Sequence, residues 1–600
     1  MTMTNLLPIA AVLLIVLFYT ALPNLRRCAL PRIEPETPGW RKHWFILLLT
    51  LLYAVLAFWK LGDRQAPQTL RRFDGESAVI TLDKSAAIGR VMLYTGIVQG
   101  NYEIEFSPDG ETWLPAASFE QGHAALLKWQ KLDLKNAPEG EMQALRITGQ
   151  HGVELCEVAV FDTADQLLPI HSDSAVLCDE QAIVPDKPYY LNSSYFDEIY
   201  HARTAWEHLR GMYPYEISHP PFGKILISVG IALFGMTPFG WRFSGTLVGV
   251  LMLPLVYWLA RRLFGGRAVP GACALLTATD LMHFAQTRIA TIDSFAVFFI
   301  LLMYGFMLGF LQRGSRRDLA LSGIFFGFGA ASKWTCFYAG AGLGVLWLAY
   351  WIRHFVEAQH TANKKGKKKK NEPEISDPSE EFLQNVLFCL LFFVAIPALI
   401  YYLSYIPYGI ARQTFPFSGE YTKIVWNNQT SMFSYHSGVH SSHPYSSRWY
   451  QWVLDIRPIL FYLDYFPDGR RSSFGAWLNP ILCWAGLLAL FVLVYAAIFR
   501  RDRKAAFLLV GYLAQLLPWV FITRTTFEYH YFPSSVFLVL ALGYVFSLLR
   551  DNRKDWRVPV YSLCILSAAV FILFYPAVSG MPVNNASATK LMKWLPTWPF

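Results

Sequence analysis

The sequence predicts a polytopic α-helical membrane protein that also carries an extracytoplasmic β domain. Three observations lead to this fold class. Hydrophobic residues make up 54% of the 600-residue chain, and many apolar stretches are long enough to cross a bilayer. Basic residues collect in short loops between these stretches. The segment from about residue 62 to 186 departs sharply from this composition, because it is charged and rich in turn residues.

The apolar stretches predict about twelve transmembrane helices. The basic clusters are consistent with a single topology in which all of them lie in the cytoplasm and both termini lie outside. The first stretch lacks a basic leader and an evident cleavage site, so we expect a retained helix rather than a signal peptide. The approximate spans are 5–23, 43–60, 241–260, 268–286, 291–311, 319–333, 336–354, 384–406, 476–499, 505–523, 533–549 and 558–576.

Charge and cysteine usage exclude several classes of partner. The net charge of +9 arises from basic residues in short loops between apolar segments, as in membrane proteins, so we expect no nucleic-acid partner. The eight cysteines form no CxxC pair and no Cys/His set with metal-ligand spacing, so no zinc site is predicted. Cys156 and Cys178 remain open between a disulfide in an oxidising compartment and two separate thiols.

The segment 62–186 has the pattern of a small β domain. The runs YEIEF at 102–106 and ELCEVAVF at 154–161 favour strands, and a Pro-Asp-Gly turn follows the first run. Together with Leu145-Arg146-Ile147, these runs resemble the discoidin-type, galactose-binding-like jelly roll. The resemblance implies carbohydrate as a candidate ligand of this domain, with a purely structural role as the alternative.

A polar island follows the β domain, from Tyr195 to Lys224, and reads YFDEIYHARTAWEHLRGMYPYEISHPPFGK. Ionisable residues beside a membrane are costly and therefore indicate function. In the predicted topology, further charged residues lie at the outside ends of different spans. A pocket of mixed charge there suits a lipid-linked phosphate, because cations neutralise the phosphate while a carboxylate acts on the acceptor. These residues are Arg242, Arg288, Asp293, Lys333, Arg524 and His530.

Several long motifs carry a family resemblance. They closely resemble the protein O-mannosyltransferase family, whose members are integral-membrane inverting glycosyltransferases of the GT-C fold. The similarity runs in order from about residue 190 to the C-terminus. The motifs are DEIYHARTA (197–205), HPPFGK (219–224), PFGWRFSGTLVGVLMLPLVYWLARRLF (238–264), MHFAQTRIATIDSF (282–295), SKWT (332–335), HPYSSRWYQW (443–452), LLPWVFITRTTFEYHYF (516–532) and FYPAVSGMPV (574–583).

The resemblance implies a domain organisation as well as a fold. The acidic island becomes the first outside loop of a catalytic core, and the long segment after Pro407 becomes a second outside loop. The expected parts are two N-terminal helices (1–61), the β domain (62–186), the GT-C core (187–355), a basic cytoplasmic loop (356–383) and a C-terminal membrane region (384–600) with an outside loop at 407–475.

The resemblance also implies a reaction. Mannose would move from a polyprenyl-phosphate-mannose donor to Ser or Thr hydroxyls of secreted or membrane proteins, at the extracytoplasmic face of the plasma membrane. Asp197 would act as general base, and Glu198 would orient the acceptor, the sugar or a neighbouring Arg; Glu198 as the base is the open alternative. No cofactor is expected, no metal ligand is assigned, and dependence on a divalent ion stays open.

Cationic side chains would stabilise the leaving phosphate. Arg242, Lys224 and His219 are the first choices, and Arg288 and His530 follow. For Arg242 and Lys224 the alternative is an anchor at the membrane interface. Asp293 is either a ligand or the ion-pair partner of Arg288. The complete set of expected substrate-binding residues is His201, Arg203, His219, Lys224, Arg242, Arg288, Asp293, Lys333, His443, Tyr529 and His530.

Two departures from the family pattern leave the substrates open. The loop 407–475 is too short for the MIR domain of eukaryotic members, so the chain resembles the bacterial type. Two helices and a β domain precede the acidic loop, which leaves the acceptor and the sugar undecided. One alternative keeps the fold but transfers another lipid-linked sugar to a cell-envelope glycan or lipid. Another is a transporter of lipid-linked sugar, which would predict internal repeats and polar residues at mid-membrane.

Overall fold

The computed structural model describes residues 43–365, 378–438, 442–552 and 554–599. The chain forms two compact units. The helical unit comprises Met1–Phe58, Gly211–Ile225 and Gly245–Phe600, and the β unit comprises Trp59–Arg210 and Leu226–Ser244. The predicted span 5–23 lies outside the described residues.

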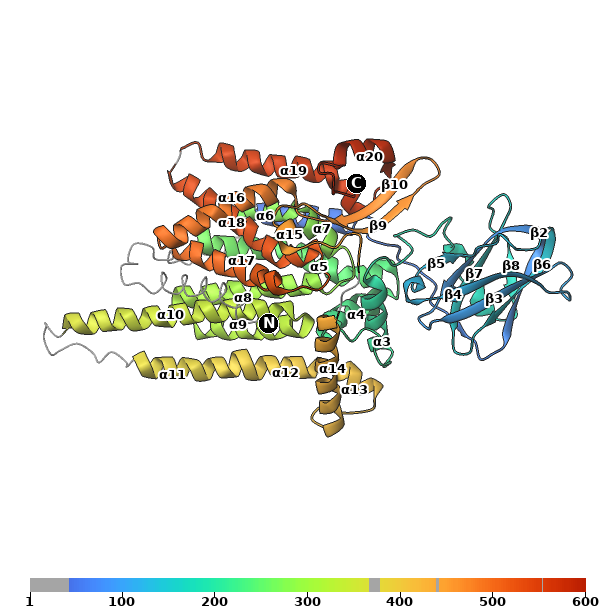
Figure 1. Cartoon of the computed structure of the whole chain (residues 1–600), viewed down its shortest axis with the longest axis horizontal. Helices are drawn as coiled ribbons and strands as arrows, with labels where there is room; N and C mark the ends of the chain where they lie inside the picture. The colour runs from blue at the N-terminus through green and yellow to red at the C-terminus, as the bar shows by residue number, and fades with distance from the viewer. Residues whose placement is uncertain (1–42, 366–377, 439–441, 553, 600) are drawn as a thin grey trace. The chain divides into compact units, whose positions relative to one another are not determined.

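Long apolar helices make up most of the helical unit (Figure 1). The helices and 3₁₀ or π segments of the chain from residue 44 to 411 are α2 (Trp44–Phe58), η3 (His123–Ala125), η4 (Ala175–Leu177), η5 (Gln181–Ile183), α3 (Glu198–Leu209), α4 (Phe222–Phe234), α5 (Pro238–Phe264), α6 (Ala268–Ala278), α7 (Leu281–Thr287), α8 (Asp293–Arg313), α9 (Arg316–Ser332), α10 (Thr335–Lys365), α11 (Pro378–Cys389), η6 (Leu390–Ala395), α12 (Ile396–Leu403) and α13 (Ile406–Ala411). The remaining helices are α14 (Gly419–Gly438), α15 (Trp449–Trp452), α16 (Pro480–Phe499), α17 (Arg503–Phe521), η7 (Glu528–Tyr531), α18 (Phe532–Asn552), α19 (Arg557–Ser579) and α20 (Asn585–Met592).

In the described part of the chain, eight helices are long and apolar enough to cross a membrane. A ninth span results if α6 and α7, which bend by 58° at their junction, count as one. Each predicted span from 43–60 onward overlaps a helix, but α2 and α9 are only 15 and 17 residues long. The chain is therefore a helical membrane protein, and the total of about twelve spans stays a prediction.

Burial separates the spans into a centre and a periphery. In the most apolar 18-residue stretch of α18, 83% of the residues are buried inside the protein. In the corresponding stretch of the α11–α13 segment, only 6% are buried. Helix α18 is thus a central element, and α11 and α12 present their apolar side chains outward, as a lipid-facing helix does. Figure 1 shows α14 running across the direction of α10, α11 and α12.

Helix ends in this unit follow local sequence signals. Gly314 ends α8 in the left-handed conformation (φ +67°), and Ser315 then accepts a hydrogen bond from the Asp318 N–H to start α9. Asn479 caps α16 and Asp502 caps α17 in the same way. Three short strands complete the unit and pair antiparallel in the order β11-β10-β9: β9 (Ile459–Tyr465), β10 (Arg470–Ala476) and β11 (Val583–Asn584).

The β unit contains an antiparallel β domain built around one long strand. The strands are β1 (Arg71–Arg72), β2 (Ser77–Thr95), β3 (Gly100–Ser107), β4 (Leu114–Gln121), β5 (Trp129–Lys131), β6 (Glu141–Gly149), β7 (Glu154–Asp162) and β8 (Ile170–Ser172). The first part of β2 pairs with β6 and β8, and its last part pairs with β7 and β5. The predicted β domain is confirmed, and its identity as a discoidin-like jelly roll stays a prediction.

Side-chain burial explains the strand patterns. In β3, Tyr102, Ile104 and Phe106 point into the core, as the alternation predicts. Strand β7 is buried on both faces, so its run does not alternate in burial. The turn after β3 holds because Asp109 accepts hydrogen bonds from the backbone N–H groups of Glu111 and Thr112. Cys156 and Cys178 are separate thiols.

Candidate active site

The acidic pair of the predicted first loop lies in the β unit, and its two carboxylates have different surroundings. The guanidinium of Arg242 donates Nε–H to Glu198 Oε1 and Nη2–H to Glu198 Oε2, both at 2.7 Å. Both side chains are fully buried. This is the bidentate geometry in which an Arg–carboxylate pair is strongest.

Three backbone carbonyls complete the surroundings of Arg242. Its Nη1 donates to the carbonyls of Leu61 (2.9 Å) and Tyr190 (2.7 Å), and its Nη2 also donates to that of Ser193 (2.9 Å). A guanidinium has five N–H donors, and these five bonds use all of them. Arg242 therefore ties Leu61 and the segment 190–193 of the β unit to Glu198 and has no donor left for a substrate phosphate.

Asp197 precedes α3 as its N-cap residue, yet its side chain makes no capping hydrogen bond. It is half-buried, whereas Glu198 is fully buried. The preceding residue, Phe196, adopts φ +51°, which is unusual for a bulky side chain. The two neighbouring carboxylates therefore have different surroundings: Glu198 binds Arg242, and Asp197 lies on the partly exposed side.

The other predicted residues of this loop lie on α3. His201 is buried, at 5% exposure. Arg203 Nε donates to Glu207 Oε1 at 2.8 Å, one turn along the helix, and Glu207 Oε2 accepts from the Thr204 hydroxyl. Arg203 thus has a local partner within α3, so its position is set by the helix.

In the helical unit, the sequence HPPFGK forms a second ion-paired cluster. The Lys224 ammonium is fully buried and donates to the Glu216 carboxylate, to the Glu216 carbonyl (2.8 Å) and to the His219 carbonyl (3.0 Å). These contacts use its three N–H donors. His219 Nδ1 lies 3.1 Å from the same Glu216 carboxylate, which therefore orients the ring. Burial lowers the pKa of His219.

Two residues at this cluster, Glu216 and His436, were missed in the sequence. His436 Nε2 donates to the Ser218 carbonyl at 2.8 Å, and its ring centroid lies 5.1 Å from that of His219. Its Nδ1 is buried and, among the described residues, has no hydrogen-bond partner. The side-chain amide of Asn428 also donates to the Ile217 carbonyl at 2.9 Å, so α14 is attached to this turn at two points.

Asp293 and Lys333 form a further ion pair, at 2.6 Å. The sequence suggested Arg288 as the partner of Asp293, and this was wrong: Arg288 instead donates to the Ala57 carbonyl at 3.0 Å and lies over the Phe284 ring. Lys333 is buried and lies 5.7 Å from the centre of the Tyr529 ring. In the described part of the chain, Asp293 is the hydrogen-bond partner recorded for the Lys333 ammonium.

Aromatic rings fix the remaining predicted residues. His530 stacks against Tyr529 (4.5 Å between centroids) and Trp452 (6.0 Å), and Trp519 meets it edge-on at 4.4 Å. His443 packs edge-on against Phe527 at 4.9 Å. These aromatic rings therefore hold His530 and His443 in place.

Positive charges of the helical unit act on one another. Burial, and then the charges of His219, Arg524 and Lys333, lower the pKa of His436 to about 4. The structure thus brings together, within this unit, His219, Lys333, Tyr529 and His530 with the unexpected His436. Such a group of cations, imidazoles and aromatic rings can bind a phosphorylated, hydroxyl-rich ligand.

Metal-ligating geometry occurs elsewhere. Among the described residues, Glu157, Asp179 and Glu180 of the β domain bring carboxylate oxygens within 4.8 Å of one another. Protein donors already contact them: Gln181 donates to Glu157, Thr69 to Asp179, and the Gln68 N–H to Glu180. None of the predicted site residues belongs to this group.

Two family models match the chain. The model described as "Dolichyl-phosphate-mannose-protein mannosyltransferase" matches residues 218–361, and the model described as "C-terminal four TMM region of protein-O-mannosyltransferase" matches residues 421–598. Together these ranges contain the HPPFGK turn, Asp293, Lys333, His436 and the η7 histidine. The β domain and the acidic pair precede both matched ranges.

Curated relatives carry consistent names. The polyprenol-phosphate-mannose–protein mannosyltransferase of Mycobacterium tuberculosis is 26% identical over 459 residues, which cover 67% of this chain and 86% of that protein. The enzyme of the same name from Mycolicibacterium smegmatis is 26% identical over 465 residues, covering 67% of this chain and 87% of its own. These names agree with the predicted enzyme class.

A solved structure shares the fold. The S. cerevisiae protein O-mannosyltransferase Pmt1–Pmt2 complex, bound to the sugar donor, aligns with a TM-score of 0.57 at 14% identity, covering 67% of this chain and 89% of that chain. This likeness confirms the predicted GT-C fold. The two family models and the mycobacterial relatives establish that the chain belongs to the protein O-mannosyltransferase family.

Proposed function

We propose that the protein transfers mannose from a polyprenyl-phosphate-mannose donor to Ser or Thr hydroxyls of proteins, with inversion at the anomeric carbon. The mycobacterial relatives are named for this donor and this class of acceptor. The general base is Asp197, and the reaction takes place at the extracytoplasmic membrane face.

The observation that carries the assignment of the base is the Arg242–Glu198 pair. Both oxygens of Glu198 accept charge-assisted hydrogen bonds at 2.7 Å in a fully buried setting. Taking a proton from an acceptor would break this pair at a large cost. Asp197 is half-buried, lies outside the pair and follows a strained residue. A base needs access to its substrate, and this favours Asp197 over Glu198.

The same reasoning changes the assignment of the cations. Arg242 and Lys224 use all their N–H donors on protein acceptors, so we assign them to positioning rather than to phosphate binding. We assign the donor phosphate to Lys333, whose recorded hydrogen-bond partner among the described residues is Asp293. His219 and His530 are assigned to the same ligand because their rings are held in fixed orientations.

The Asp197 carboxylate takes the proton of the acceptor hydroxyl as its oxygen forms the new bond to the anomeric carbon. The bond from that carbon to the phosphate oxygen breaks, and the polyprenyl phosphate leaves with the electron pair. General-base assistance is worth about 10²–10⁴-fold in rate, and fixed cations stabilise the negative charge on the phosphate.

The distribution of charge along the helices supports the proposed side of the membrane. Asp293 begins α8 and Arg313 ends it; the helix has 21 residues, a length of roughly 30 Å. Arg316 and Arg317 follow at the same end as Arg313. Because basic loops favour the cytoplasm, the Asp293 end is assigned to the extracytoplasmic side.

The test is transfer of radiolabelled mannose from synthetic polyprenyl-phosphate mannose to a Ser/Thr-rich acceptor peptide. The purified wild type should transfer, and Asp197→Asn should lose at least a hundredfold while eluting as the same monodisperse species. Asp179→Asn in the β domain serves as the matched control and should remain active. A wild type that uses GDP-mannose without any polyprenyl phosphate would contradict the proposal.

A further inference from the structure

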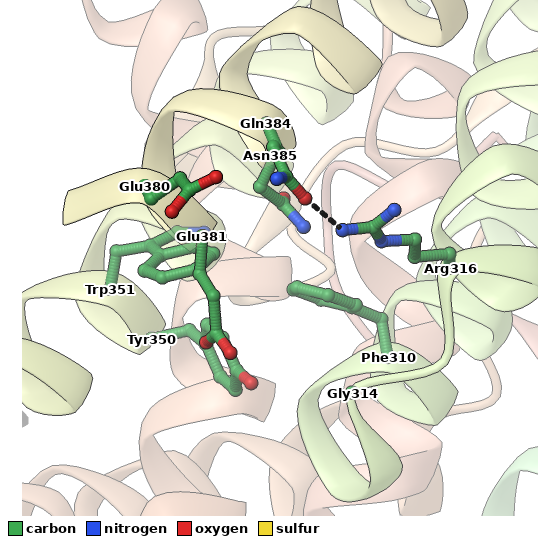
Figure 2. Close-up of a pocket in the computed structure, with 9 residues that line it drawn as sticks. All are labelled: Phe310, Gly314, Arg316, Tyr350, Trp351, Glu380, Glu381, Gln384 and Asn385. Carbon is green, nitrogen blue, oxygen red and sulfur yellow. Dashed lines mark hydrogen bonds between the residues drawn. The ribbon is translucent and has the colours of Figure 1, made fainter. Parts of the chain in front are cut away.

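A cavity of about 380 Å³ lies among four helices of the helical unit, away from every residue assigned above. Its volume falls in the usual range of small-ligand sites. Figure 2 shows side chains converging on it from α8, α9, α10 and α11. The lining residues are Phe310, Gly314, Arg316, Tyr350, Trp351, Glu380, Glu381, Gln384 and Asn385.

Charge is divided across this cavity. Glu380 and Glu381 lie on the α11 side, and Arg316 extends from the start of α9 on the other side (Figure 2). Arg316 Nη2 donates to Gln384 Oε1 at 3.1 Å, so the guanidinium is held toward the cavity by a neutral partner. A ligand that carries both a negative and a positive group would match this division.

The aromatic wall adds a hydrogen-bond donor. Trp351 is only 4% exposed, and its Nε1 is buried without a hydrogen-bond partner among the described residues. Leaving such a donor unpaired costs free energy, which a ligand acceptor would recover. The Trp351 ring already packs against Phe382 (5.3 Å) and Tyr350 (5.6 Å). Its N–H, more than its faces, is therefore what it offers a ligand.

The cavity lies at the helix ends that carry the basic loop residues, where a lipid headgroup would be found. Arg316 is next to the C-terminal end of α8, and Glu380 begins the span that is only 6% buried inside the protein. The span packs on α9 through one face, and its exposed apolar side chains form a surface suited to lipid beside the cavity.

We propose that the cavity binds the headgroup of a phospholipid that carries a primary ammonium and a phosphate diester. The phosphate is bound by Arg316 and the Trp351 N–H, and the ammonium by Glu380 and Glu381. Arg binds phosphate through charge-assisted hydrogen bonds, and a primary ammonium can donate to two carboxylates whereas a quaternary one cannot. The bound headgroup joins α9, α10 and α11, and so holds the exposed α11–α12 span against the bundle.

The proposal is tested with the full-length protein, delipidated in detergent and examined by native mass spectrometry. Phosphatidylethanolamine is titrated beside phosphatidylcholine, phosphatidylglycerol and the soluble headgroup glycerophosphoethanolamine, all with matched acyl chains where they have any. We expect phosphatidylethanolamine to bind with a Kd at least tenfold lower than that of each of the other three. Equal binding of phosphatidylcholine would overturn the ammonium assignment, and equal binding of glycerophosphoethanolamine would overturn the assignment to a lipid.

Variants locate the site. Arg316→Gln and the double variant Glu380→Gln with Glu381→Gln should each raise the Kd for phosphatidylethanolamine at least tenfold. Trp351→Phe keeps an aromatic ring but removes the N–H, and should raise the Kd for phosphatidylethanolamine severalfold. Arg316 and Glu380 are exposed, so their replacement leaves the fold intact. The matched controls are Arg317→Gln and Glu357→Gln, which do not line the cavity and should bind as the wild type does. Unchanged binding in Arg316→Gln and in the double glutamate variant would overturn the proposal.

Discussion

Arg242 and Glu198 form a fully buried, bidentate ion pair with two hydrogen bonds of 2.7 Å. Glu198 directly follows Asp197, the proposed base, in the chain. Two adjacent carboxylates thereby acquire different tasks: one holds the loop to Arg242, and the other is left on the accessible side. This division of roles leads to the first prediction.

Replacing one member of the Arg242–Glu198 pair should affect the stability of the fold more than the catalytic step. Glu198→Gln or Arg242→Gln leaves the other charge buried without its counter-ion, and each should lower the free energy of unfolding by about 3–5 kcal/mol. Asp197→Asn should retain wild-type stability. Thermal unfolding monitored by size-exclusion chromatography in detergent measures all three variants.

A double variant supplies the control for this pair. Glu198→Leu combined with Arg242→Met removes both charges, and should be more stable than the summed effects of Glu198→Leu alone and Arg242→Met alone predict. Additive effects of the two changes would mean that the pair is not the stabilising interaction. The assignment of Glu198 to positioning would then have to be withdrawn.

Lys333 and Lys224 should respond differently to the same substitution. Each substitution leaves a buried carboxylate without its cation, Asp293 for Lys333→Met and Glu216 for Lys224→Met, so both should lower stability. Only Lys333→Met also removes the cation assigned to the donor phosphate, so it should raise the KM for polyprenyl-phosphate mannose at least tenfold relative to Lys224→Met. Binding of polyprenyl phosphate to the purified variants measures this second effect directly. If Lys333→Met bound it as well as the wild type, Lys333 would not be the phosphate ligand.

Sequence reasoning found the membrane helices, the β domain and the acidic pair, because apolar length, strand alternation and the clustering of charge are local signals. It could not find how charges pair. Asp293 pairs with Lys333, 40 residues away, rather than with the nearby Arg288, since that choice depends on how α8 and α9 pack. Lys224 pairs with Glu216 across a turn, and the pattern of apolar residues does not predict the geometry of that turn.

The role of His436 could not be predicted from the sequence either. His436 lies in a segment that also contains His440 and His443, and nothing in the sequence separates the three. Only the contact of α14 with the Ser218 carbonyl distinguishes His436. The sequence predicts Arg242 as a phosphate ligand, whereas its five hydrogen bonds to protein acceptors favour a positioning role.

Glu216 should be necessary for the local structure of the HPPFGK turn. It binds Lys224 and orients His219 through one carboxylate. Glu216→Leu removes both interactions and should lower both stability and activity. Adding Lys224→Met should restore part of the stability, because no buried charge remains, but should not restore the orientation of His219. Proteolysis of the folded state and the transfer assay separate these two effects, and recovery of both together would contradict the role given to His219.

His436 should make the attachment of α14 sensitive to acid. Burial and neighbouring positive charges lower its pKa to about 4, below the usual value of 6.5. Between these values the folded state binds fewer protons than the unfolded state, so the stability contribution falls as pH drops from about 6.5 to about 4. It is fully present above pH 7. Hydrogen exchange of Gly419–Gly438 in the intact protein should therefore speed up across this window.

The matched variant for this effect is His436→Gln, which keeps a side-chain donor for the Ser218 carbonyl but does not titrate. Its exchange in α14 should be flat between pH 7 and pH 4 once the intrinsic pH dependence of exchange is removed. His360→Gln, at an exposed position near the end of α10, should retain the pH dependence of exchange that the wild type shows. If His436→Gln kept that dependence too, another group would be responsible, and the contact between His436 and Ser218 would not govern how α14 is held.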